Sequence, residues 1–193
     1  MSRKLRDKLF KRYRPNVRPF NLYDGDMYHK DMGILWASYS RSPFKELPGD
    51  LTQAEFAERI VELYQQAEMF MVEDKSSAYD DTGPVAIVWI YSDGWEFEPH
   101  VEFMAWATDR NKLTSTVSFF QWIRFKRAIG LCKVESLKES LSLFNKCIDY
   151  GVLKYSGRLK AIDPRGTIYI FYIKGKNYVK QHKATDTIAN IET

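Results

Sequence analysis

Acid–base side chains alternate along one stretch of the chain, residues 95–107. In a strand, every second side chain points to the same face, unless a β-bulge resets the alternation. One face of this stretch would carry Glu96, Glu98, His100, Glu102, Met104 and Trp106. A carboxylate or an imidazole in such a row can accept a proton from a substrate and act as a general base. Two plainer interpretations remain open: a lone strand histidine is commonly a surface residue, and carboxylates on a solvated face can simply balance nearby lysines and arginines.

Metal and thiol chemistry find little support in the sequence. The chain has two cysteines, Cys132 and Cys147, and three histidines, His29, His100 and His182. Their spacing matches no zinc-ligand pattern and no disulfide framework. No histidine lies beside either cysteine in the sequence, so we expect both thiols to be small core residues and not nucleophiles. We therefore expect no metal cofactor.

The elements that must position the acid–base residues alternate between strand and helix. The continuous apolar run 85–91 predicts a strand buried on both faces, and Asp93-Gly94 is a strong hairpin signal that pairs it with 95–107. Thr52 and Glu55 form a capping box ahead of an amphipathic helix, and Gly151 stands where a second helix needs a C-terminal cap. The predicted order is strand 17–20, helix 28–38, helix 52–67, strands 69–73, 85–91 and 95–107, helix 113–129, strand 131–135, helix 137–148, and strands 152–161 and 167–173.

This alternation implies an α/β (α+β) chain with a mixed, mostly antiparallel central sheet and helices on both faces. The 193 residues, 45% of them hydrophobic, suit a single domain with one core of ordinary size. The loop from Ser40 to Asp50 contains two prolines and a glycine and could flank a pocket. The longest apolar run, 85–91, is too short to cross a membrane.

The order of elements resembles that of the GNAT superfamily of acyl-coenzyme A dependent N-acyltransferases over residues 17–174. Two local segments carry the resemblance. The run Gly83-Pro84-Val85-Ala86-Ile87-Val88 is similar to the family's glycine-led strand entry, and residues 140–152 are similar to its helix and turn before a final glycine. The resemblance implies a GNAT-like fold, acetyl-coenzyme A as acyl donor and a primary amine as acceptor.

The resemblance also implies catalytic roles. The family commonly takes its general base from the strand at 95–107, which makes Glu102 the first candidate, ahead of Glu98 and Glu96. The family's acid is a tyrosine at the position of Cys147, and a thiol is a poor substitute for a phenol. Tyr150 is therefore our candidate for protonating the departing thiolate, with Tyr155 also nearby in the sequence.

The resemblance predicts a coenzyme A site at the end of the same strand and the start of the next helix. The residues expected to contact it are Met104, Ala105, Trp106, Arg110, Asn111, Lys112, Ser115 and Ser140. The family signature R/Q-x-x-G-x-G/A lets the backbone approach the diphosphate at a helix N-terminus. Arg110 matches it, but Leu113 and Ser115 occupy the glycine positions. Helix amides and Lys112 could still attract an anion; the alternative is an ordinary helix start.

Basic residues are concentrated at the N-terminus. Residues 1–18 hold eight basic residues and one acid, a charge of +7, so the total of +4 leaves −3 for residues 19–193. Such an arm could bind nucleic-acid phosphates, lie on an anionic membrane or dock into an acidic groove of a partner. We favour protein partners or a homo-oligomer over nucleic acid, because Phe10 and Tyr13 are the only aromatics in its dense part. We divide the chain into a basic arm (1–16), a GNAT-like domain (17–174) and a polar tail (175–193).

Two functions follow from these expectations. The first is acetyl transfer from acetyl-coenzyme A to a primary amine. The second is a catalytically inactive protein of the same fold, similar to virion components of tailed phages, that uses its arm to bind partners; Leu113 and Ser115 favour it. A nucleic-acid-binding module ranks last. No signal peptide is recognisable, so we expect a cytoplasmic protein, or a virion component in the second case.

Overall fold

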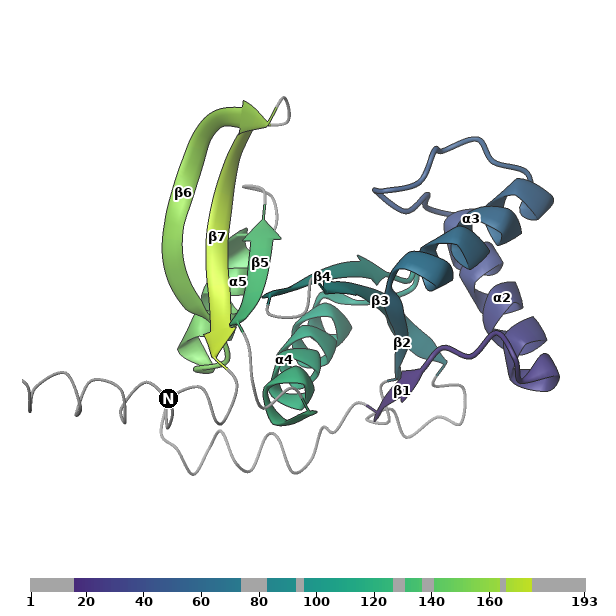
Figure 1. The fold of residues 1–193 in the computed structure, drawn as a ribbon, viewed down its shortest axis with the longest axis horizontal. Helices are drawn as coiled ribbons and strands as arrows, with labels where there is room; N and C mark the ends of the chain where they lie inside the picture. The colour runs from purple at the N-terminus through teal and green to yellow at the C-terminus, as the bar shows by residue number, and fades with distance from the viewer. Residues whose placement is uncertain are drawn as a thin grey trace, which may run out of the picture. The chain divides into compact units, whose positions relative to one another are not determined.

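A computed structural model describes residues 16–73, 83–92, 96–126, 131–136, 141–163 and 166–174. The helices and strands follow the predicted order (Figure 1). Their bounds are β1 Asn16–Pro19, α2 Gly25–Tyr39, α3 Gln53–Gln66, β2 Glu68–Glu73, β3 Pro84–Ser92, β4 Glu96–Phe103, α4 Asp109–Lys126, β5 Leu131–Ser136, α5 Leu141–Asp149, β6 Lys154–Asp163 and β7 Gly166–Lys174. Within these ranges, no helix is long and apolar enough to span a bilayer.

The described residues fall into two compact units. The first takes in the described residues up to 91 together with 99–119, and the second takes in 92, 96–98 and the described residues from 120 to 174. Strand β4 and helix α4 each contribute residues to both units. The predicted arm at 1–16 and tail at 175–193 lie almost entirely outside the described residues, so their boundaries stay predictions.

The first unit contains the strands β1, β2 and β3 and the C-terminal part of β4, hydrogen-bonded in that order. The pairs β1–β2 and β2–β3 are antiparallel, with Val72 opposite Val17 and Met71 opposite Ile87. The Met104 amide donates to the Val85 carbonyl at 3.0 Å and so extends the contact between β3 and β4. Residues 84–90 of β3 are all buried, which confirms the prediction of a strand covered on both faces.

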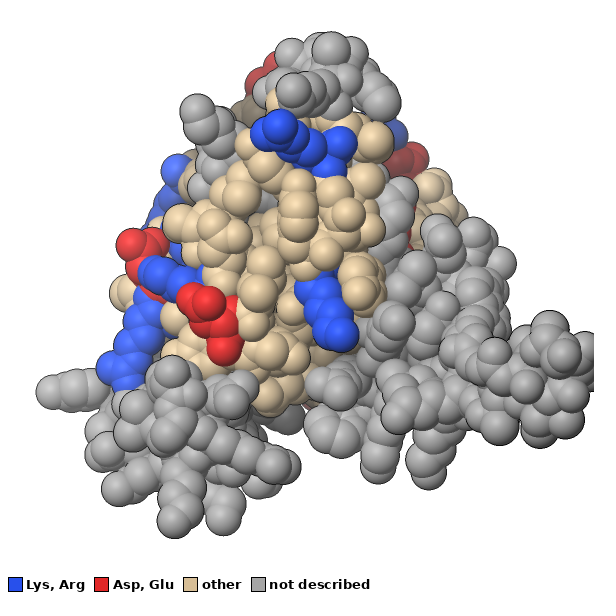
Figure 2. Space-filling model, turned by 90° about the vertical axis from the view of Figure 1, so that its left-hand side faces the viewer, with Lys and Arg blue, Asp and Glu red and all other residues tan. Residues whose placement is uncertain are grey.

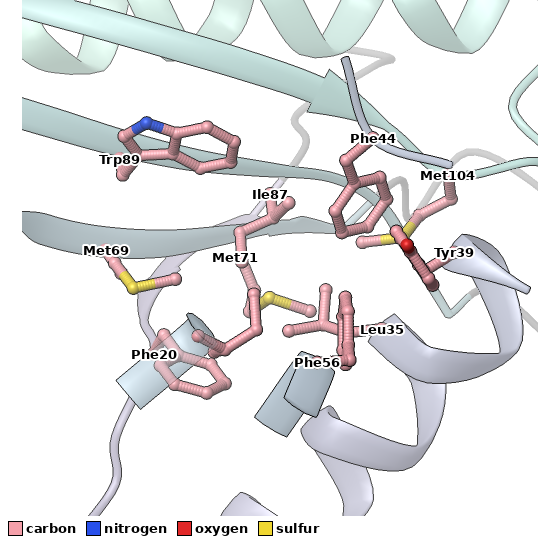
Figure 3. Close-up of a cluster of buried hydrophobic side chains, with 11 residues drawn as sticks. Phe20, Leu35, Tyr39, Phe44, Phe56, Met69, Met71, Ile87, Trp89 and Met104 are labelled. Carbon is pink, nitrogen blue, oxygen red and sulfur yellow. The ribbon is translucent and has the colours of Figure 1, made fainter. Parts of the chain in front are cut away.

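Helices α2 and α3 cover one face of these strands (Figure 3). Thr52 accepts from the Glu55 amide and Glu55 accepts from the Thr52 amide, which confirms the predicted capping box of α3. The arginine Arg18 ties β1 to α2 through two 2.7 Å bonds to Asp31, whose side chain is 1% exposed. The buried residues of this face are Phe20, Leu35, Tyr39, Phe44, Phe56, Ile60, Met69, Met71, Ile87, Trp89 and Met104.

The boundary between β4 and α4 differs from the prediction at both ends. Strand β4 stops at Phe103 and not near Ala107, because the Ala105 amide turns to the Ser38 hydroxyl of α2 at 2.8 Å. Helix α4 starts at Asp109 and not at Leu113. Residues 109–112, which lie between the predicted strand and the predicted helix, therefore form the first turn of α4.

The second unit contains β5, β7 and β6 beside the N-terminal end of β4. Strands β5 and β6 each pair antiparallel with β7, whereas Glu96 and Phe97 of β4 pair parallel with β5. Helix α5 stacks Phe144 on Phe171 of β7, with the ring centroids 5.3 Å apart. Gly151 has φ of 72° and donates to Ile148, and the next amide, of residue 152, donates to the carbonyl of residue 147. These contacts confirm the glycine cap predicted for α5.

Figure 2 shows the side of the molecule that lies at the left of Figure 1, where β6 is found. Most of the described atoms on this face belong to uncharged residues, and a few lysines, arginines and acids stand among them. Two large apolar side chains of β6 are exposed, Tyr155 by 50% and Leu159 by 38%.

Candidate functional site

The face of β4 that carries His100 and Glu102 meets the loop between α2 and α3. The His100 ring contacts the Glu46 carboxylate, and a Glu102 oxygen accepts from the Lys45 amide at 2.8 Å. Phe103 lies on the opposite face, where the Lys112 ammonium of α4 is 6.0 Å from its ring centre. The alternation predicted from the sequence therefore holds over this part of the strand.

Glu102 is a carboxyl group that titrates near neutral pH. Burial raises its pKa to about 7, and the negative charge of Glu46 adds to the rise. Hydrogen bonds from the backbone amides of Lys45 and Glu46 act in the opposite direction, because they stabilise the ionised form. A carboxylate with this pKa can accept and release a proton at physiological pH, as a general base must.

His100 is held on several sides. Its Nδ1 contacts a carboxylate oxygen of Glu46. Its ring lies parallel to that of Trp89, with centroids 6.0 Å apart, and edge-on to that of Tyr91 at 5.2 Å. The side chain is only 24% exposed. His100 is therefore a fixed part of this face and not a loosely placed surface residue.

The loop that supplies Lys45 and Glu46 is anchored to the core. The Tyr39 hydroxyl donates to the Pro48 carbonyl and accepts from the Leu51 amide at 3.2 Å. Phe44 is buried against Tyr39, and Figure 3 shows both side chains next to Met104 at the end of β4. Because these contacts lie on both sides of residues 45 and 46, they fix the backbone amide that binds Glu102.

The start of α4 is closed by a reciprocal cap. The Thr108 hydroxyl accepts from the Asn111 amide at 3.2 Å, and the Asn111 carbonyl oxygen of the side chain accepts from the Thr108 amide at 3.1 Å. The Ala107 amide donates to Met104, and the Lys112 amide donates to the Thr108 carbonyl. Most backbone amides of this corner, residues 104–112 between β4 and α4, therefore donate hydrogen bonds within the chain itself.

Several solved structures with similar folds are acetyltransferases. A chimera of the Vibrio cholerae spermidine N-acetyltransferase SpeG with hSSAT superposes with a TM-score of 0.62 at 11% identity, over 86% of this chain and 98% of that chain. The V. cholerae enzyme in complex with CoA and spermine gives 0.58 at 10% identity, over 86% and 98%. AAC(6')-Ib in complex with ribostamycin and coenzyme A gives 0.58 at 11% identity, over 86% and 96%.

The chain has the GNAT fold. It is an α+β fold whose sheet is mostly antiparallel, as the sequence predicted. No family model and no curated protein matches the sequence, so the likeness to GNAT acetyltransferases is one of fold.

The residues predicted to contact coenzyme A occupy different settings in this GNAT fold. Met104 is 1% exposed and packs in the apolar core, and Ala105 gives its amide to Ser38. Trp106 is 38% exposed, and its indole N–H donates to the Pro84 carbonyl. Ser115 is buried, with its hydroxyl donating to a carbonyl of the preceding helical turn, and Ser140 lies outside the described residues.

The first turn of α4 carries two cationic side chains, Arg110 and Lys112, and no glycine at the family's signature positions. Arg110 is exposed, and Lys112 is partly exposed with its ammonium 3.9 Å from the Asp109 carboxylate. Both cations stand at a helix N-terminus, whose dipole favours an anion. The Ala105 and Thr108 amides of the preceding turn donate to Ser38 and Asn111, and the Asn111 amide donates to Thr108, so side chains would carry most of the contact.

The remaining predicted site residues belong to the second unit. Glu98 is half-buried on β4, and nothing is described of the Glu96 side chain. Tyr150 is half-buried at the end of α5, where its amide donates to the Lys146 carbonyl. Cys147 is buried, and burial raises the pKa of its thiol to about 12, which confirms it as a core residue. Among the described residues, no group of three or more acidic, histidine or cysteine side chains could hold a metal ion.

Proposed function

We propose that this protein transfers an acetyl group from acetyl-coenzyme A to a primary amine. The observation that carries the proposal is Glu102, a carboxyl group with a pKa of about 7 on a strand of a GNAT fold. A base is most effective when its pKa lies near the working pH, and an ordinary glutamate at about 4.3 is a much weaker proton acceptor.

Glu102 would prepare the acceptor for reaction. An alkylamine is protonated at neutral pH, since its pKa is about 10, and it has to lose a proton before its lone pair is available. The Glu102 carboxylate takes up that proton and becomes a neutral acid, a form that its buried setting favours. The Lys45 amide holds the carboxylate in place during this change. When the nitrogen bonds to the acetyl carbon and the carbon–sulfur bond breaks, the nitrogen gives up a second proton and the leaving sulfur takes one up. Tyr150 stays our candidate for the group that protonates the sulfur.

The acyl donor would be held at the start of α4. Acetyl-coenzyme A, when bound, supplies the acyl group as a thioester. Arg110 and Lys112 are the cations that would meet its phosphates, together with the positive end of the helix dipole. Because side-chain charges would provide most of this contact, we expect the affinity for the donor to fall as salt is added.

Acceptors that carry positive charge are the first to test. Glu102 and Glu46 give the acceptor side of the site a negative charge, which favours a cation. Spermidine, spermine and ribostamycin, the compounds named for the similar structures, provide such a panel.

Titration calorimetry of the full chain with acetyl-coenzyme A tests the proposal directly. We expect saturable binding below millimolar concentration, a raised melting temperature in the same buffer, and acetylated product with at least one amine of the panel. Desulfo-coenzyme A, which keeps the phosphates and lacks the thiol, is the matched control for phosphate binding. Absence of heat and of any thermal shift at millimolar acetyl-coenzyme A would contradict the proposal.

A second candidate function is a catalytically inactive GNAT-fold protein that binds partners through its basic arm. The observation that favours it is the closed start of α4, where Thr108 and Asn111 cap each other. The same calorimetric titration separates the two candidates, because an inactive assembly protein needs no acyl donor. Deletion of residues 1–14 would then abolish oligomerisation or partner capture and leave the body folded.

A further inference from the structure

The contact between His100 and Glu46 joins two parts of the chain that are 54 residues apart. His100 cannot easily turn away, because Trp89 lies against the face of its ring and Tyr91 meets it edge-on. Trp89 is itself fully buried in the core. The imidazole is thus a rigid anchor point on β4, and the Glu46 carboxylate is the partner it fixes.

Glu46 follows directly after the residue that binds the candidate base. The Lys45 amide donates to Glu102, and the Glu46 side chain reaches His100 on the same strand face. Fixing Glu46 to His100 therefore also fixes the neighbouring amide against Glu102. The Glu46 side chain is 38% exposed, so its carboxylate stands at the edge of the site where water and an acceptor can reach it.

We propose that Glu46 and His100 are positioning residues for Glu102: their contact latches the loop between α2 and α3 onto β4, keeps the Lys45 amide on the Glu102 carboxylate, and holds one negative charge beside it. This inference rests on the proposed acetyl transfer, in which Glu102 is the base. The latch has two separable parts, namely a hydrogen bond that sets position and a charge that sets the proton affinity of Glu102.

The charged groups that act on Glu102 come from the loop and from β4. Glu46 raises the pKa of Glu102, and the positive charge of Lys45 lowers it. His100 lies two residues away on the same strand face and is paired with Glu46. Loss of the Glu46 charge alone should therefore let Glu102 ionise at lower pH.

Two substitutions at one position separate the parts of the latch. Glu46→Gln keeps a side-chain oxygen that can accept from His100 Nδ1 but removes the charge. Because Glu46 also gives the acceptor side of the site a negative charge, we expect its KM for a cationic acceptor to rise. At saturating acceptor above pH 8 its kcat should fall less than that of Glu46→Ala, while the acidic limb of the kcat profile moves down by about half a pH unit or more. Glu46→Ala removes the hydrogen bond as well, and we expect kcat to fall about 10- to 100-fold with KM for acetyl-coenzyme A unchanged.

Glu58→Gln is the control, because it removes the same charge from an exposed position of α3. His100→Phe keeps a ring against Trp89 but has no donor, and it should reproduce the loss of kcat seen in Glu46→Ala. The carboxyl 13C titration of Glu102, assigned with Glu102→Gln, gives a readout that needs no activity and should move down in Glu46→Gln.

The outcomes of this experiment are distinguishable. If the wild type acetylates an amine and Glu46→Ala behaves like Glu58→Gln, the positioning role is wrong. If Glu46→Gln leaves both the kcat profile and the 13C titration unchanged, the charge does not act on Glu102. If the wild type acetylates no amine, the proposed function fails, and the 13C titration still decides whether Glu46 governs this carboxyl group.

Discussion

The two sides of the corner between β4 and α4 are built in different ways. On the side of the loop between α2 and α3, Glu46 contacts His100, and the neighbouring Lys45 amide binds Glu102, whose pKa burial raises to about 7. On the side of the first turn of α4, backbone amides are bound within the chain, and two cationic side chains are what an anion would meet. In the proposed function, acid–base chemistry would thus rest on contacts within the chain, whereas phosphate binding would rest on two exposed or partly exposed side chains. This difference predicts that changes at the base affect kcat and that changes at α4 affect donor affinity.

The largest effect is expected from Glu102→Gln. The amide is nearly the same size as the carboxyl group and can still accept from Lys45, but it cannot take up a proton. We expect kcat to fall about 100- to 1,000-fold, as is usual for the loss of a general base, with the affinity for acetyl-coenzyme A unchanged. Steady-state rates and titration calorimetry measure the two quantities. If the kcat of Glu102→Gln lies within twofold of that of Glu58→Gln, Glu102 is not the general base.

Glu102 should also make the free energy of unfolding depend on pH. Burial raises the pKa of Glu102 to about 7 in the folded protein, above its value in the unfolded chain. Its contribution to the free energy of unfolding is therefore complete below the unfolded pKa and is lost as the pH rises through 7. Glu102→Gln does not titrate. The wild type should therefore lose up to about 3 kcal/mol relative to this variant between pH 4 and pH 8.5. Urea denaturation of both proteins at the two pH values measures this difference, and parallel pH dependence would show that Glu102 is not perturbed.

On the other side of the corner, Arg110→Ala combined with Lys112→Ala should weaken donor binding. Each charge at a helix N-terminus contributes up to about 1 kcal/mol, so we expect the Kd for acetyl-coenzyme A to rise about tenfold and its salt dependence to become smaller. The kcat at saturating donor should stay near that of the wild type. An unchanged Kd in low salt would show that the phosphates of the donor do not bind at Arg110 and Lys112.

Much of this fold could be predicted from the sequence because its signals are local. The capping box at Thr52 and Glu55, the glycine cap at Gly151 and the buried run of β3 each depend on residues close together in the chain, and all three are confirmed. The start of α4 was missed since its cap uses Thr108 with Asn111 and not the usual glutamate. An asparagine three residues after a threonine was the signal that could have located it.

The candidate site could be predicted only in part. Alternation along β4 correctly placed His100 and Glu102 on one face, because strand geometry alone determines it. It could not show that Glu46 and Lys45 lie against that face, since the contact joins residues 54 positions apart and depends on how Tyr39 and Phe44 fix the loop. The proton affinity of Glu102 depends on this loop as well, so no spacing rule could have given it.

The smallest effect concerns the two reciprocal caps, and it tests why the two sides of the corner differ. Thr108→Ala and Thr52→Ala each remove a hydroxyl that accepts from a helix amide, and each should lower the free energy of unfolding by about 1 kcal/mol. Only Thr108→Ala releases an amide, that of Asn111, at the proposed phosphate site. We therefore expect its Kd for acetyl-coenzyme A to fall by a factor of about two to five, whereas Thr52→Ala should leave the Kd unchanged. Denaturation and calorimetry on the same samples measure both quantities. Equal Kd values in the two variants would mean that the cap at α4 does not compete with the donor. Leu113 and Ser115, which occupy the family's glycine positions, would then be the feature that distinguishes the start of α4 from an open phosphate-binding loop.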